Sequence, residues 1–343
     1  MKQNIILADC YPDEIEAFVE GCNSVVTNSN FKILSFISIG SHKGVINNIV
    51  RYFKYFKYPF YIFLNRKKYN IIFGWQQFYA INFALFCRIF RVKKKNILIA
   101  GNYTYKAKNG FIGKLYYHYM KYSCKYIDYF HVPSFKYAER NSKELSIPIE
   151  KFIVQSFGIV DISDIVGNLK VPISNYSFSI GRSNRDFDFL VQVWSQPCLK
   201  DNILVIASDT WKTSVNLPKN IIFRDDMKSQ ESYIWIKNSC ICITSIDDGN
   251  LCSGDTVLLT GMMFAKPVVI TKPSTLAEMY VEDGVNGICV EKNAEKAALI
   301  ISDLLNDDEK RETLGNNARK CFLEKFSRKS MGIQMCKKIK ELS

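Results

Sequence analysis

The sequence has few residues that could hold a metal ion. Its 343 residues include three histidines, His42, His118 and His131, and eleven cysteines, no two of which form a C-x-x-C pair. Protein zinc sites use Cys, His and carboxylate ligands that usually come in closely spaced pairs. The irregular cysteine spacing in a chain of this length also argues against a disulfide framework. We therefore expect no metal site, and reduced thiols as in a cytosolic protein.

The sequence also lacks a long apolar run. The longest stretch without a charged residue, Tyr69 to Cys87, has 19 residues, which is barely enough to cross a bilayer. Asparagine and glutamine side chains interrupt this stretch, and a helical pattern begins only at Gln76. We expect a buried strand followed by a helix here, not a transmembrane span.

Acidic residues are missing from one long segment. Gly21 to Ile127 contains 18 lysines and arginines and no aspartate or glutamate, and it includes the aromatic stretch RYFKYFKYPFYIFLNRKKY (51–69). Beyond residue 160 basic and acidic residues nearly balance, at 23 and 24. A basic, aromatic surface fits an anionic partner, such as a phosphate-bearing lipid head group, an acidic membrane face or a nucleic acid. The alternative is a basic face that is merely solvated.

Short β-branched runs alternate with longer helical patterns, which predicts parallel β-α-β units. A less regular segment, Asp161 to Asn175, interrupts the alternation once. The expected strands are Ile5–Ala8, Ile33–Ser38, Ile71–Phe73, Ile97–Ala100, Tyr129–Val132 and Phe152–Gln155, then Phe178–Ile180, Ile203–Ala207, Ile221–Phe223, Cys240–Thr244, Val268–Thr271 and Gly287–Val290. We expect an α/β fold of two Rossmann-like, doubly wound domains that face each other across a cleft. Ligands of such domains bind at the carboxyl ends of the strands.

The segment FSIGRSNRD (178–186) places two arginines directly after an expected strand. Gly181 allows a tight turn there, and Arg182 and Arg185 follow it. Guanidinium groups at the carboxyl end of a strand could hold phosphate oxygens in bidentate fashion. The alternative is an ordinary strand–helix turn with surface arginines.

The segment CSGDTVLLTGMMFAKPVVIT (252–271) combines a polar start, a helix and a buried strand. Ser253 or Asp255 can cap the helix, and Gly254 lets the backbone approach a ligand closely. The free N–H groups and the dipole at a helix N-terminus attract anions. A purely structural cap is the alternative, and the Asp255 carboxylate would repel a phosphate unless it points away.

These two segments, together with STLAEMYVEDGVNGICV (274–290), resemble retaining glycosyltransferases of the GT-B fold. The family, also called family 4 or group 1, is large and uses nucleotide-sugar donors. Residues 132–159 are similar to the end of its N-terminal domain, and the resemblance is weak before residue 95. It implies an acceptor- and membrane-facing domain over residues 1–165, a donor-binding domain over 166–325, and a C-terminal helix over 326–343 that returns to the first domain.

The resemblance also implies roles for individual residues. Gly181 and Arg182 match a turn whose arginine contacts the donor diphosphate, and Arg185 lies near a second basic position. A further match covers the loop and helix start beneath the diphosphate and sugar, which here are Ser253, Gly254, Asp255 and Thr256.

Two departures from the family pattern concern its pair of glutamates, one facing the donor sugar and one the ribose. Cys252 and Thr260 occupy these positions. Asp247, Asp248 or Asp255 could take over hydroxyl recognition, and Glu278 is expected on a short helix near the cleft. A Gly-Gly loop after the first strand is also absent, because the sequence there is ADCYPDE (8–14).

These features predict a cytoplasmic hexosyltransferase that needs no cofactor and no metal. It would transfer a sugar from a nucleoside-diphosphate sugar to a lipid-linked, polyprenyl diphosphate saccharide in surface polysaccharide or capsule biosynthesis. Its N-terminal domain would contact the anionic inner face of the cytoplasmic membrane. We expect no nucleic-acid partner, since no RNA- or DNA-binding motif is present.

The family resemblance implies that configuration is retained. An inverting reaction would need a general base, for which Asp9, Asp13 and Glu14 are the candidates. The alternatives to a transferase are a nucleotide-sugar epimerase of the same fold, a non-catalytic sugar-nucleotide binder and a nucleic-acid-binding protein.

Overall fold

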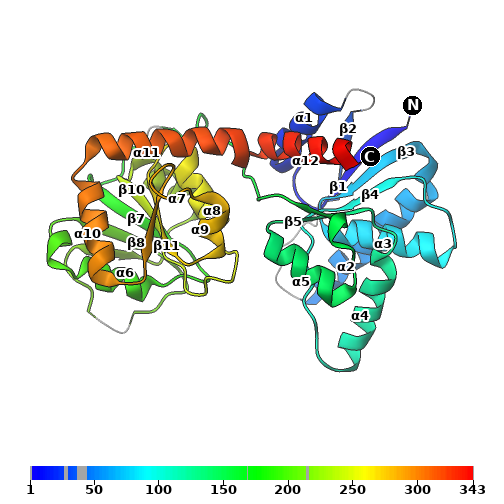
Figure 1. Ribbon diagram of the computed structural model, residues 1–343, viewed down its shortest axis with the longest axis horizontal. Helices are drawn as coiled ribbons and strands as arrows, with labels where there is room; N and C mark the ends of the chain where they lie inside the picture. The colour runs from blue at the N-terminus through cyan, green and yellow to red at the C-terminus, as the bar shows by residue number, and fades with distance from the viewer. Residues whose placement is uncertain (1, 27–29, 37–44, 168, 214–215, 343) are drawn as a thin grey trace. The chain divides into compact units, whose positions relative to one another are not determined.

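The chain divides into two compact units, each with its own sheet and core (Figure 1). The computed structural model describes residues 2–26, 30–36, 45–167, 169–213 and 216–342. The first unit comprises Met1–Val160 together with Arg328–Ser343, and the second comprises Asp161–Ser327. The chain thus leaves the first unit at Val160 and returns to it at Arg328. The boundaries expected from the sequence were after residues 165 and 325.

The first unit is built on a six-stranded parallel sheet with the order β2-β1-β3-β4-β5-β6. Its strands are β1 (Gln3–Ala8), β2 (Phe31–Ser35), β3 (Tyr69–Gly74), β4 (Ile97–Ala100), β5 (Tyr129–Val132) and β6 (Phe152–Val154). Successive residues of a strand face opposite sides of the sheet. In β1, Ile5 and Leu7 belong to one buried core, and Ile6 and Ala8 belong to the core on the other side. Both faces are therefore covered, which explains why the strands consist mostly of apolar residues.

Helices form the two covering layers of this sheet. One layer holds α2 (Val45–Leu64), α3 (Gln77–Ile89), α4 (Gly110–Cys124) and α5 (Phe135–Leu145), and the other holds α1 (Asp13–Val25) and α12 (Arg328–Leu342). Gly21 and Gly332 allow α1 and α12 to pack closely, because a Cβ on either glycine would overlap the backbone of the facing helix. The C-terminal helix is thus part of the first unit.

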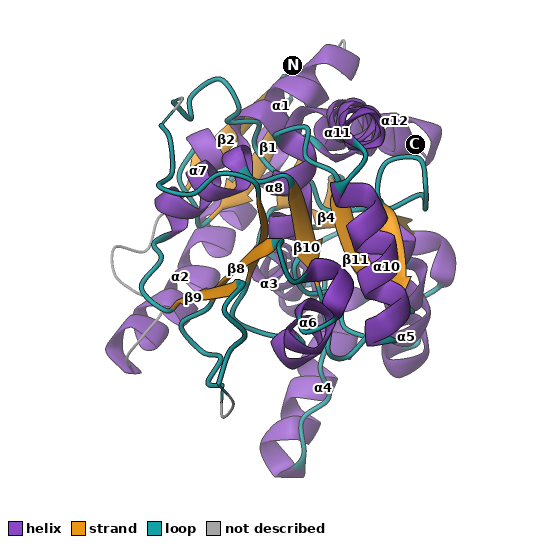
Figure 2. Cartoon of the chain, turned by 90° about the vertical axis from the view of Figure 1, so that its left-hand side faces the viewer, coloured by secondary structure: helices purple, strands orange, loops and turns teal. Residues whose placement is uncertain are grey.

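The second unit repeats this architecture (Figure 2). Its parallel sheet has the order β12-β11-β10-β7-β8-β9. The strands are β7 (Tyr176–Ile180), β8 (Ile203–Ala207), β9 (Ile221–Arg224), β10 (Ile241–Thr244), β11 (Val268–Lys272) and β12 (Ile288–Glu291). The helices are α6 (Phe187–Trp194), α7 (Ser229–Asn238), α8 (Asp255–Met263), α9 (Thr275–Tyr280), α10 (Ala294–Leu305) and α11 (Asp308–Cys321).

The strand orders indicate where ligands bind. In doubly wound sheets a ligand lies outside the carboxyl ends of the strands, at the point where the strand order reverses. This point lies between β1 and β3 in the first sheet and between β7 and β10 in the second. Asp9 directly follows β1, and the Gly181–Arg182 turn directly follows β7. Both segments therefore occupy the positions that this fold reserves for ligands.

The predicted α/β class with two Rossmann-like domains is confirmed. The strand expected at Ile33–Ser38 is β2, which spans Phe31–Ser35, and residues 37 and 38 as well as His42 lie outside the described residues. The uncharged stretch from Tyr69 to Cys87 forms β3 and most of α3. No helix in the described part of the chain is long and apolar enough to cross a membrane.

Candidate functional site

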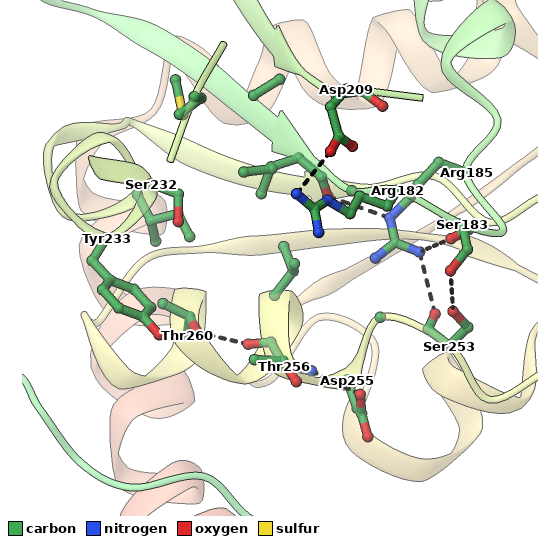
Figure 3. A pocket seen from close by; sticks show the side chains of 18 of the residues that line it. Arg182, Ser183, Arg185, Asp209, Ser232, Tyr233, Ser253, Asp255, Thr256 and Thr260 are labelled. Carbon is green, nitrogen blue, oxygen red and sulfur yellow. Dashed lines mark hydrogen bonds and ion pairs between the residues drawn. The ribbon is translucent and has the colours of Figure 1, made fainter. Parts of the chain in front are cut away.

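A pocket of about 450 Å³ lies at the carboxyl ends of β7, β8 and β9 in the second unit (Figure 3). The N-terminal turns of α8, which follows β10, form another wall. The pocket is thus at the strand-order reversal of this sheet, and its volume is in the range of small-molecule sites. Its basic side chains come from the loop between β7 and α6.

Arg185 is the half-buried cation of this pocket. Burial lowers the pKa of its guanidinium, and the nearby Asp255 carboxylate opposes that shift. All four hydrogen bonds that it donates to described residues go to backbone carbonyl oxygens: Nε to Ile180 (3.4 Å), and Nη1 to Ser183 (3.1 Å), Asn184 (3.3 Å) and Ser253 (3.3 Å). None of these acceptors carries a full negative charge. An anion in the pocket would therefore gain from a positive charge that its hydrogen-bond partners leave uncompensated.

Two glycines make room for this guanidinium. A Cβ at Gly181 would lie 2.6 Å from Arg185 Nε, and a Cβ at Gly254 would overlap Arg185 Nη2. Gly254 also has a φ of +109°, a conformation that side-chain-bearing residues rarely adopt. The two segments that the sequence singled out thus meet at one side chain, with Arg185 between the glycine of each.

Arg182 comes from the same loop as Arg185 and also lines the pocket. Its side chain is 76% exposed, and its Nη2 atom is 2.7 Å from Asp209 Oδ2. Ion pairs with this exposure stabilise a protein by about 1 kcal/mol or less. A phosphate, which can accept two parallel hydrogen bonds from a guanidinium, can therefore replace Asp209 as the partner at little cost. Arg182 is thus the exposed cation of the pocket, and Arg185 is the one held by four backbone carbonyl oxygens.

The start of α8 differs in one respect from the expected anion site. Gly254 is the N-cap, and Ser253 contributes its carbonyl oxygen to Arg185. The Asp255 carboxylate bonds to the start of the helix itself, because its Oδ1 accepts a hydrogen bond of 2.9 Å from the N–H of Thr256. One of the N–H groups expected to bind a diphosphate is thus occupied, and an anion must displace this carboxylate to reach it.

Neither residue at the expected glutamate positions offers a carboxylate. Thr260 is buried and lines the pocket, but its hydroxyl donates a hydrogen bond of 2.7 Å to the carbonyl oxygen of Thr256. Cys252 is not among the pocket-lining residues, and its Sγ contacts Met279 Sδ at 3.6 Å. Burial raises the pKa of Cys252 to about 12, so its thiol stays neutral at physiological pH.

Of the other candidates for hydroxyl recognition, Asp255 lines this pocket, whereas Asp247, Asp248 and Glu278 do not. Asp248 Oδ1 accepts a hydrogen bond of 3.0 Å from the N–H of Asn250, and its own N–H donates to Asn184 Oδ1 at 2.7 Å. Glu278 is exposed on α9. Among the described residues the structure brings Gly181, Arg182 and Arg185 together with Ser253 to Thr256 and Thr260, but not with Asp248, Cys252 or Glu278.

Sequence reasoning did not single out several residues of the pocket, although it expected the loop after Ile221–Phe223 to recognise the donor base. Asp209 and Asp225 follow β8 and β9, and Ser232 and Tyr233 come from α7. A signal for the two aspartates was present, because each stands just behind an expected strand and parallel strands end at a common edge. No comparable signal marked Ser232 and Tyr233, since the sequence did not show which side of α7 faces the pocket.

In the first unit, Asp9 differs from the other acidic candidates. Tyr55 on α2 donates a hydrogen bond of 2.9 Å to Asp9 Oδ2, which orients the carboxylate at the end of β1. Burial and then the Asp9 charge raise the pKa of Tyr55, so its hydroxyl stays a donor. Asp13 is exposed in the first turn of α1, and Glu14 Oε1 accepts the N–H of Tyr11 at 3.0 Å. Only Asp9 combines a fixed orientation with a position at the strand-order reversal.

No group of three or more His, Cys, Asp or Glu side chains suited to a metal is found in the part of the chain that the structure describes. The expectation of a reaction without metal or cofactor stays a prediction.

Comparison with known proteins bears first on the second unit. Residues 208–321 match the family model described as "Glycosyl transferases group 1". A curated relative, an uncharacterized glycosyltransferase of Methanocaldococcus jannaschii, is 38% identical over 92 residues. That match covers 25% of this chain and 24% of the relative, so the chain spans about a quarter of the curated relative's length.

Solved structures match over the whole chain. HepE of Anabaena in complex with UDP superposes with a TM-score of 0.64 at 13% identity, covering 99% of this chain and all of that one. A glycosyltransferase from Rickettsia africae gives a TM-score of 0.65 at 16% identity with complete coverage of both chains. At this level of identity the structures establish the fold. Residues 208–321 therefore match the group 1 glycosyl transferase family, as the sequence motifs predicted, and the chain as a whole has the two-domain fold of the GT-B glycosyltransferases.

Proposed function

We propose that the protein is a glycosyltransferase that transfers a sugar from a nucleoside-diphosphate sugar to a lipid-linked saccharide in surface polysaccharide biosynthesis. The observation that carries the donor assignment is the position of Arg185, held between Gly181 and Gly254 at the strand-order reversal of the second sheet. The match of residues 208–321 to group 1 glycosyl transferases supports it. So does the fold of HepE, whose structures contain UDP and UDP-glucose.

In this proposal the two arginines bind the donor diphosphate. Arg185 supplies a fixed positive charge, and Arg182 exchanges Asp209 for a phosphate oxygen. When the glycosidic bond breaks, negative charge develops on the leaving diphosphate, and preorganised cations stabilise that charge. The chemistry then requires no metal ion. Tyr233 lines the same pocket and is available to the sugar or the nucleoside, and the Thr260 hydroxyl, whose hydrogen is donated to Thr256, could act there only as an acceptor.

Donor binding is tested with a thermal-shift panel of nucleoside-diphosphate sugars. A donor present at 100 times its Kd stabilises the folded state by about 2.7 kcal/mol, which raises the unfolding temperature by several degrees. We expect one class of nucleotide sugar to do so, and inorganic phosphate at the same concentration not to. A panel in which no nucleotide sugar shifts the transition would refute the assignment.

Retention of configuration is also part of the proposal. A retaining transfer needs no dedicated protein base, so Asp9→Asn should lower kcat by less than about tenfold, and the product anomer seen by NMR should match the donor. General-base catalysis contributes about 10²- to 10⁴-fold. An inverted product together with a loss of that size would instead make Asp9 the base, oriented by Tyr55. Asp13→Asn, in the exposed first turn of α1, is the matched control.

We assign the acceptor to the first unit, at the inner face of the cytoplasmic membrane. The support is the charge distribution, since the segment from Gly21 to Ile127 has 18 basic and no acidic residues. A polyprenyl diphosphate acceptor has both a lipid chain and a negative charge, and it resides in the membrane. An epimerase of the same fold would not need this basic surface, and it would turn over its donor without an acceptor.

A further inference from the structure

Helix α2 exposes an unusual set of side chains. Ten of its described residues are exposed, and the only charged one is Lys57. The nine others are large and apolar or aromatic: Ile46, Ile49, Val50, Tyr52, Phe53, Phe56, Phe60, Tyr61 and Leu64. Their spacing of three and four residues places most of them on one continuous stripe. Monomeric soluble proteins rarely expose contiguous apolar surface of this kind unless it binds something.

Helix α2 also has a side that is packed against the core of its own unit. The opposite side of α2 is already packed, with Tyr55, Ile62 and Phe63 in the buried core of the first unit. Asn82 on α3 donates a hydrogen bond of 2.7 Å to the Tyr55 carbonyl oxygen. The exposed side is therefore held outward by the fold, on a helix that is apolar on both sides.

Neighbouring helices also expose large apolar side chains at their ends. Ile89 and Phe90 are more than half exposed at the end of α3. The Phe90 ring stacks on Phe63 of α2, with 5.3 Å between the ring centroids. At the start of α4, Phe111 and Ile112 are each 75% exposed. The following list defines what we call the lipid-facing surface: the nine exposed residues of α2 with Ile89, Phe90, Phe111, Ile112 and Leu115.

The buried Asn82 side chain, which binds the α2 backbone, also binds α4. Tyr119 on α4 donates a hydrogen bond of 2.7 Å to Asn82 Oδ1, so Asn82 joins α2, α3 and α4. Exposed lysines surround the apolar residues, with Lys57 on α2 and Lys67 and Lys68 just after it. Lys106, Lys108 and Lys114 flank Phe111 and Ile112 in the same way. Apolar residues bordered by cations, with no acid in this part of the chain, are complementary to an anionic bilayer.

We propose that α2 and α4 together form a membrane mount, in which the lipid-facing surface enters the acyl boundary of an anionic bilayer and the flanking lysines contact lipid head groups. This inference deepens the proposed function and shares its membrane-resident acceptor, but it rests on observations of the first unit alone. It places the helix that orients Asp9 through Tyr55 directly at the bilayer surface.

Two other occupants fit the surface less well. A second copy of the chain would bring two acid-free, basic faces together, which like-charge repulsion opposes. A nucleic acid would pair with the lysines, but it gains little from exposed aliphatic side chains such as Ile46, Ile49 and Ile112. Of the three partners compared, only a lipid surface would interact favourably with both the aliphatic residues and the cations.

The test is flotation of the full-length protein with vesicles of phosphatidylcholine containing 30 mol% phosphatidylglycerol. We expect binding that weakens with salt and is weaker still to pure phosphatidylcholine. Burial of one large apolar side chain is worth about tenfold in partitioning. The double variant Ile49→Asn/Phe53→Asn should therefore bind vesicles at least about tenfold more weakly. The matched control is Ile165→Asn/Leu299→Asn, which removes two exposed apolar side chains of the second unit and should bind like the wild type.

Every other outcome has a defined meaning. Absence of vesicle binding by the folded wild-type protein would overturn the proposal. So would a folded α2 double variant that binds vesicles as tightly as the wild type. A wild-type dimer in light scattering that the α2 variant converts to a monomer would make this surface a subunit interface instead. Competition by a single-stranded oligonucleotide would indicate a nucleic-acid partner. Donor-induced thermal shifts, measured on the same samples without vesicles, show separately whether the donor assignment stands.

Discussion

Gly254→Ala is expected to abolish donor binding within the measurable range, a loss of at least about 100-fold in affinity. The substitution does two things at once. A residue with a Cβ is strained by about 1–2 kcal/mol in the left-handed region of φ, and Gly254 has a φ of +109°. The new Cβ would also overlap Arg185 Nη2. The guanidinium must then leave its place between the two glycines, and the pocket loses its fixed positive charge.

Gly284→Ala separates strain from displacement. Gly284 has a φ of +78°, and a Cβ there would meet no atom within 4 Å. Both variants should lose a similar amount of stability in thermal unfolding, but only Gly254→Ala should lose the donor in calorimetric titration. If both variants kept wild-type donor affinity, Arg185 would not be a donor ligand. If both lost it equally, backbone strain in the unit would explain the loss.

Arg182→Ala should lower kcat/KM by about 100- to 1000-fold. That is the usual effect of removing one preorganised donor from a developing anion, and Arg182 is the side chain best placed to follow the diphosphate as it leaves. Arg182→Lys should recover only part of the loss, because an ammonium group retains the charge but cannot form two parallel hydrogen bonds. Steady-state kinetics over a range of donor concentrations gives both numbers.

The partner of Arg182 supplies a second comparison. Asp209→Asn removes the ion pair at 2.7 Å, so kcat/KM should stay within about threefold of the wild type or rise. Lys329→Ala breaks an exposed ion pair with Glu20 in the first unit, outside the pocket, and should leave kinetics unchanged. An Arg182→Ala enzyme with near wild-type kcat/KM would contradict the diphosphate assignment.

Much of this architecture could be predicted from the sequence, because the signals are local and repeated. Parallel strands buried on both sides appear as short apolar runs, and the Gly-Arg turn behind one of them marked the pocket. The contact between the segments could not be predicted, since it depends on Arg185 reaching across to Gly254. The hydrogen bond of Asp255 could not be predicted either. Its carboxylate is close enough to the N–H of Thr256 to bind it, which spacing alone does not reveal.

The membrane mount shows a different limit of sequence reasoning. The composition of residues 51–69 indicated a basic, aromatic surface but not which side chains form it. A helix with apolar residues on every side is compatible with complete burial. Only the packing of Tyr55, Ile62 and Phe63 on one side and the exposure of Ile49 and Phe53 on the other show that the stripe faces outward.

The most direct test of the account is mass spectrometry of a polyprenyl diphosphate saccharide incubated with the protein and the nucleotide sugar that stabilises it. We predict an increase by one sugar residue, with release of one nucleoside diphosphate per product, and loss of this activity in Arg182→Ala. Conversion of the donor with no change in the acceptor mass would contradict the account and indicate an epimerase or a hydrolase instead.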